Sequence, residues 1–105
     1  MSFNVIWSNF AELQFANIHN YYLRNISEHV AKSISKNILL AVKKLETTPY
    51  VGQKEDLLKG RVIEYRYLVY SNYKIIYSVE ENSNFVKIHD VFDTRQSPIK
   101  IKRNL

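Results

Sequence analysis

The chain has 105 residues, of which 46% are apolar and 13% aromatic, and its formal net charge is +5. This is the length of one domain that can bury a core. The absence of cysteine excludes disulfides and thiolate chemistry, and with neither a long apolar run nor a signal-peptide pattern we expect a cytoplasmic protein that does not bind membranes.

The N-terminal half predicts a short strand over residues 3–7, followed by a helix. Ser8 and Asn9 both offer helix N-caps, and Asn9 with Glu12 three positions on fits the pattern of a capping box. Apolar side chains then recur at helical spacing as far as Arg24.

A second helix is predicted over residues 28–46, with Ser27 as its N-cap. Pro49 disfavours helical backbone at the residue before it and so ends this region. Because the link between the two helices is short, we expect them to pack as an antiparallel hairpin.

The C-terminal half predicts an antiparallel meander. Its strands are rich in β-branched and aromatic side chains and lie at residues 67–70, 73–79 and 85–92. Only Ser71 and Asn72 separate the first two, which is hairpin spacing, and Asn tolerates the positive φ of such a turn. Residues 61–65 are expected to open the sheet.

Strands and helices are thus segregated along the chain, which predicts an α+β fold. We expect an N-terminal strand and a helical hairpin packed on a three- to four-stranded antiparallel sheet. The domain is predicted to span residues 1–98. Residues 99–105 form a basic tail that either pairs as an edge strand or hangs free.

Simple alternation along the last strand predicts two faces. The apolar one carries Val86, Ile88 and Phe92. The other continues past the strand as a polar row of Lys87, His89, Asp93 and Arg95. Basic groups beside a proton carrier suit a site that handles phosphate, but such a row also describes an ordinary solvent-facing strand.

The basic excess is strongest near the C-terminus, where residues 84–105 carry five basic and two acidic side chains. This favours an acidic or polyanionic partner, such as RNA, DNA or an acidic protein. The candidate residues for binding a target or a phosphate are Arg61, Lys87, Arg95, Lys100, Lys102 and Arg103.

Several apolar side chains lie beyond the core stripes of the two helices. They are Phe10, Leu13, Tyr21, Leu39 and Leu40. A partner chain can cover such residues or add a strand at a free sheet edge; the alternative is that they fill the core from the helix flanks. The histidines lack metal-ligand spacing, so we expect neither a metal nor a cofactor.

Four features follow one another in a definite order: Pro49–Gly52, Arg61, the strand Tyr73–Tyr77 and the run Val91–Pro98, which contains Asp93-Thr94-Arg95. With this order, length and basic balance, residues 5–98 resemble the RelE/ParE superfamily of toxins from type II toxin–antitoxin (plasmid stabilisation) systems. The tail has no Tyr, Phe or His to act as a terminal acid or stacking group, which favours the ParE-like branch.

The resemblance implies a toxin that binds a protein target such as DNA gyrase, with a cognate antitoxin covering the apolar helix residues. The alternative is a RelE-like, metal-independent mRNA interferase acting on the ribosome. Arg61 and Arg95 would then bind the phosphate, and His89 or Asp93 would carry the proton. A third possibility is a non-toxic relative that only binds a partner.

Overall fold

The computed structural model describes residues 2–105. Its strands are β1 (Asn4–Trp7), β2 (Gln53–Lys54), β3 (Arg66–Tyr70), β4 (Tyr73–Glu80) and β5 (Phe85–Asp93). Its helices are α1 (Asn9–Asn25) and α2 (Glu28–Lys43), with short 3-10 helices η1 (Lys44–Glu46), η2 (Asp56–Leu58) and η3 (Pro98–Asn104). No helix within residues 2–105 has the length and apolar character needed to cross a membrane.

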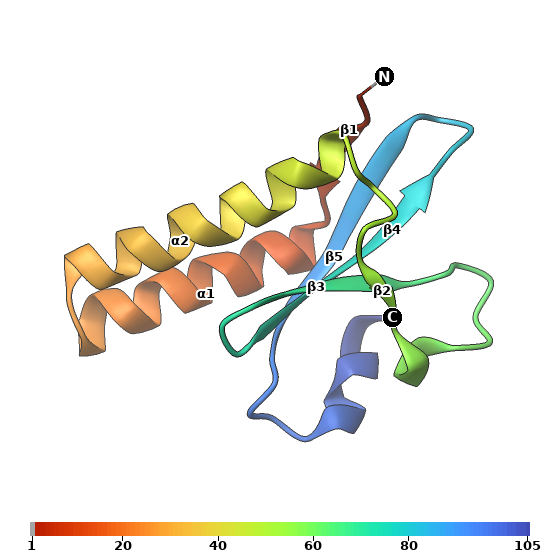
Figure 1. Ribbon diagram of the computed structural model, residues 1–105. Coiled ribbons are helices and arrows are strands. Elements are labelled where there is room, and N and C mark those ends of the chain that lie inside the picture. The colour runs from red at the N-terminus through yellow and green to blue at the C-terminus, as the bar shows by residue number, and fades with distance from the viewer. Residues whose placement is uncertain (1) are drawn as a thin grey trace.

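The sheet formed within residues 2–105 has five strands in the order β1-β5-β4-β3-β2. β1 pairs in parallel with β5, and the other neighbours are antiparallel. The α+β fold with its helical hairpin is therefore confirmed, and Figure 1 shows both helices on one side of the sheet. The sheet is mixed rather than purely antiparallel, because the helical hairpin returns the chain so that β5 can pair alongside β1.

The two helices begin at serine caps. The Ser8 hydroxyl accepts a hydrogen bond from the Ala11 backbone N–H at 3.0 Å, and Ser27 accepts one from Val30 at 3.1 Å. Ser8, rather than Asn9, is thus the cap of α1, because Asn9 is already helical. The second helix is confirmed, and its last turn tightens into η1.

The main core lies between the helical hairpin and the sheet. Its buried helix residues are Ala11, Ile38, Val42 and Leu45. They pack against the sheet residues Tyr73, Ile75, Tyr77, Val86, Ile88 and Val91. Burial of this apolar face is what fixes the hairpin on the sheet.

A second, smaller core lies on the opposite face of the sheet. It joins Leu58, Tyr65, Ile76, Phe92 and Ile101. Ile101 belongs to η3 and is 1% exposed, so the tail is neither an edge strand nor free. Pro98 begins this 3-10 helix, where its missing N–H costs nothing.

A β-bulge at His89 corrects the predicted faces of the last strand. Tyr77 pairs with Ile88 but Ile76 pairs with Asp90, so His89 is the extra residue. Alternation therefore restarts after it: Phe92 packs in the second core, opposite Ile88. The predicted polar row is split, with Lys87 and His89 on the η3 side of the sheet and Asp93 on the helix side.

Residues 61–65 also differ from expectation, because they form a bend and the strand begins only at Arg66. The chain enters this bend through Gly60, whose φ of +83° suits glycine. Val62 is fully exposed there.

Candidate functional site

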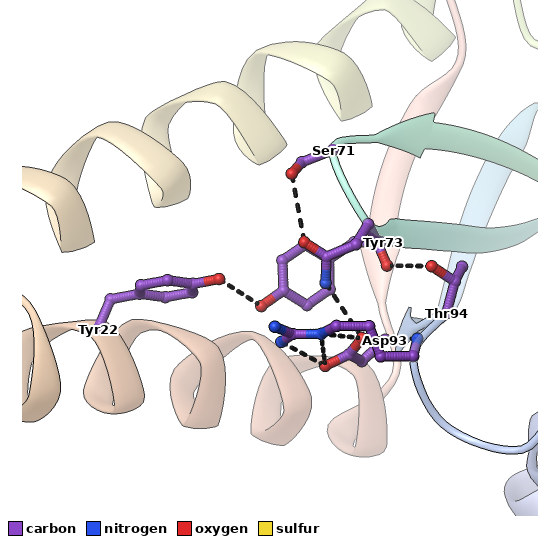
Figure 2. A network of polar contacts seen from close by, with 7 residues as sticks. Tyr22, Ser71, Tyr73, Asp93 and Thr94 are labelled. Atoms are coloured by element: carbon purple, nitrogen blue, oxygen red, sulfur yellow. Dashed lines mark hydrogen bonds and ion pairs between the residues drawn. The ribbon is translucent and has the colours of Figure 1, made fainter.

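The candidate site lies where the β3–β4 turn meets the end of β5. Tyr70 and Tyr73 pair across the turn, which confirms the predicted hairpin, although Ser71, at φ +53°, takes the left-handed conformation. The Asn72 carbonyl accepts hydrogen bonds from the Thr94 backbone N–H at 2.8 Å and its hydroxyl at 2.7 Å. Figure 2 shows the second of these bonds joining the turn to the segment after β5.

Asp93 is the acceptor at the centre of this corner. Its Oδ1 accepts from the Asn72 side-chain amide at 3.1 Å and from the Arg95 backbone N–H at 2.9 Å. The Arg95 guanidinium donates through Nε at 3.0 Å and through Nη2 at 2.8 Å. These donors lower the pKa of Asp93 to about 2, led by the Arg95 side chain.

A tyrosine pair connects this corner to the helical hairpin. The Tyr22 hydroxyl of α1 lies 3.1 Å from that of Tyr73. Figure 2 shows the two side chains pointing toward each other. Tyr73 is 3% exposed, and its burial raises the pKa of its hydroxyl above the ordinary value. On α2, Asn37 donates to the Tyr70 hydroxyl at 3.1 Å. Both helices are therefore tied to the turn by hydrogen bonds.

An open hollow of about 340 Å³ lies between α1 and this corner. Its polar lining includes Gln14, Asn17, Tyr21, Arg95, Gln96 and Arg103. Of the residues predicted to bind a target or phosphate, the fold thus brings Arg95 and Arg103 to one place.

Arg103 reaches this hollow from η3 and is held by a buried carboxylate. Its Nη2 and Nε donate to the two oxygens of Asp90 at 3.0 and 3.2 Å. Asp90 is fully buried, and this burial raises its pKa while Arg103 lowers it. The guanidinium lies 5.2 Å from the Phe10 ring and 5.3 Å from the Phe92 ring.

His89 is on the other face of the sheet from Asp93. Its side chain is buried, and Nε2 lies 2.7 Å from the Ser78 hydroxyl while the ring packs edge-on against Tyr65. Burial, with a smaller effect of Lys87, lowers its pKa to about 4. The ring is therefore neutral at pH 7 and is not positioned beside Asp93 and Arg95.

Arg61 lines a different hollow, formed by the loop that contains η2. Lys54 and Lys59 lie in the same lining. Among residues 2–105 Arg61 has no ion-pair partner, and it lines a different hollow from Arg95, with which it would bind the phosphate in the ribonuclease alternative. Lys100 and Lys102 are exposed on η3.

The apolar residues predicted to meet a partner divide into two groups. Leu13, Tyr21, Leu39 and Leu40 are each about half exposed, so they do not fill the core. Phe10 is half buried beneath Arg103. Phe10 is shielded by the Arg103 guanidinium but belongs to neither core.

Sequence reasoning missed Asp90 and Tyr22. An acid inside the apolar run IHDVF was the available signal for Asp90, because a charge at the centre of a sheet requires a partner. Within residues 2–105 no cluster of three or more histidine or acidic side chains is arranged to hold a metal ion.

Residues 5–98 match a family described as "ParE toxin of type II toxin-antitoxin system, parDE". Among solved structures, the fold is similar to a chain of the "Chromosomal ParDE TA system from P. aeruginosa", with a TM-score of 0.71 and 16% sequence identity. That superposition covers 88% of this chain and 96% of the other. A search of curated proteins gives no match.

Proposed function

The chain belongs to the family of ParE toxins of type II toxin–antitoxin systems, and from this we propose that it inhibits growth by binding a protein target such as DNA gyrase and that a cognate antitoxin neutralises it. The family match over residues 5–98 is the observation that carries this proposal. It agrees with the sequence resemblance, in which the ParE-like branch is favoured.

The geometry of the predicted catalytic residues favours binding over chemistry. His89 is buried and neutral on one face of the sheet, whereas Asp93 is fixed in its charged form at the helix side. A general acid or base needs reach to the reacting proton and a pKa near the working pH. Neither side chain meets both conditions.

Antitoxin binding is supported by the apolar surface of the helical hairpin. Leu13, Tyr21, Leu39 and Leu40 expose about half of their surface, and a partner that covers them gains hydrophobic free energy. A strand added at the sheet edge is a second means of attachment, because among the described residues β2 pairs only with Tyr67 and Arg66 of β3.

The target is tested with purified toxin in two assays. We expect inhibition of gyrase supercoiling and intact mRNA on toxin-loaded ribosomes. Cleavage of A-site mRNA would replace this proposal with the ribonuclease alternative. If induction in cells without antitoxin leaves growth unchanged, the chain is a non-toxic relative.

Neutralisation is tested with the protein encoded beside the toxin gene. Co-expression is expected to restore growth, and Leu40→Glu is expected to weaken the complex by placing a charge in the covered surface. Val69→Glu is the matched control, since Val69 is an apolar residue that is more exposed than Leu40 and lies on β3 rather than on the hairpin. Equal affinity of the two variants would contradict the hairpin as the antitoxin surface.

A further inference from the structure

The Asp93–Arg95 ion pair is oriented with its cation toward solvent. The Arg95 side chain is 61% exposed and that of Asp93 24%. Both Asp93 oxygens already accept hydrogen bonds, from Asn72 and from Arg95 itself. The corner therefore offers hydrogen-bond donors to the hollow and little free acceptor capacity.

One edge of the Arg95 guanidinium is free to bind. A guanidinium has five N–H donors, and Asp93 engages only Nε and Nη2. Within residues 2–105 Nη1 has no hydrogen-bond partner, so the edge formed by Nη1 and Nη2 remains available. This edge matches a planar carboxylate through two parallel hydrogen bonds.

The remaining lining suits a peptide that carries one such carboxylate. Gln14, Asn17 and Gln96 add side-chain amides, while Ile18 and Val91 provide apolar contact. Asp93 and Asp90 balance the two arginines, so these four groups have no net formal charge. A single carboxylate is accommodated by hydrogen bonding, whereas a phosphodiester chain requires an excess of positive charge.

The hollow also adjoins the surface assigned above to the antitoxin. Tyr21 lines it and is 52% exposed. We propose that this hollow is a carboxylate-binding site in which Arg95 anchors an aspartate or glutamate side chain of the bound antitoxin. The proposal rests on the proposed function and adds a polar anchor to it.

The first experiment uses a hexaglutamate peptide and nuclear magnetic resonance of the intact toxin. Titration is expected to shift the Arg95 Nε–H signal and the side-chain amide signals of Gln14 and Gln96. Inorganic phosphate is the comparison ligand and is expected to cause much smaller shifts. Equal shifts with phosphate, or none with the peptide, would overturn the assignment.

The second experiment uses the toxin–antitoxin complex. Arg95→Lys keeps the positive charge but cannot donate two parallel hydrogen bonds to one carboxylate. We expect the dissociation constant of the toxin–antitoxin complex to rise about tenfold to a hundredfold. Arg24→Lys is the matched control, since Arg24 is an exposed arginine in the last turn of α1, and it is expected to leave the affinity unchanged. Circular dichroism would establish that both variants are folded.

Substitution of each antitoxin Asp and Glu by its amide identifies the anchored residue. One of these substitutions is expected to lose its effect when Arg95 is already lysine, as a double-mutant cycle detects. If the antitoxin neutralises the toxin and no such pair exists, the anchor is wrong while the proposed function stands. If the antitoxin does not neutralise, the proposed function itself fails.

Discussion

Asp93 makes a pH-dependent contribution to stability. Its pKa is about 2 in the folded protein, against an ordinary value of 3.8. The folded state thus favours the charged carboxylate more than the unfolded chain does. This contribution is complete above about pH 4 and is lost as the pH falls from there toward 2.

We therefore expect Asp93→Asn to lower the free energy of unfolding by about 1–2 kcal/mol near pH 7. The difference from the parent protein should shrink below pH 4 and be largely lost as the pH falls through 2. Urea unfolding at a series of pH values measures it, with Asp56→Asn as the control for removing an exposed charge. A difference that stays constant from pH 6 to pH 2 would contradict the assignment.

The contacts of this corner differ in how far the sequence alone could predict them. Asp93 and Arg95 are two residues apart, so their proximity was predictable from the strand end. The contact between Tyr22 and Tyr73 was not, because it depends on how α1 crosses the sheet. Asp90 and Arg103 also meet only through the position of η3.

Local patterns predicted the helices well, because their caps and apolar spacing act over one or two turns. The bulge at His89 was not predictable, since the sequence on both sides of it remains strand-like. One extra residue moves every later side chain of the strand to the opposite face of the sheet. This is why Phe92 packs in the second core and why the predicted polar row does not exist.

The loop before β2 depends on a close approach at Gly52. Its backbone N–H donates to the Tyr77 hydroxyl at 2.8 Å. An added Cβ would clash with that hydroxyl and would lie 2.7 Å from the Tyr67 carbonyl oxygen. Gly52 is thus required by packing, in a segment whose sequence indicated only a loop.

We expect Gly52→Ala to reduce the free energy of unfolding by roughly 1–3 kcal/mol, the usual cost of overpacking. Gly60→Ala is the comparison: no heavy atom lies within 4 Å of its Cβ, but φ is +83°. Its cost should be about 1 kcal/mol, from backbone strain alone. Thermal unfolding of both variants measures the difference, and a smaller loss for Gly52→Ala would refute the packing argument.

The two faces of the sheet are closed by different parts of the chain. The helical hairpin covers one, and η3 with Ile101 covers the other beside η2. Asp90 and Arg103 fix η3 across the second face. Composition predicted a basic tail, but it could not show that one of these charges neutralises a buried acid.

Arg103→Met is expected to destabilise the protein by about 3–5 kcal/mol, because it leaves the Asp90 charge buried without its partner. Asp90→Asn combined with Arg103→Met should recover most of this loss. Lys102→Met is the control, as an exposed cation of the same segment. Denaturant unfolding compares the three, and equal losses for the single and double variants would exclude the ion pair as the cause.

The parallel pairing of β1 with β5 joins Asn4 to Phe85 and Trp7 to Ile88. A ribosome synthesises the chain from its N-terminus, so β1 and the helical hairpin emerge before β5, the strand with which β1 pairs, is synthesised. The main core is completed only when β5 follows, and the second face closes only with η3. A chain that ends before β5 lacks both the neighbour of its first strand and the Asp93–Arg95 corner, so the proposed binding surface forms only after β5 has been synthesised.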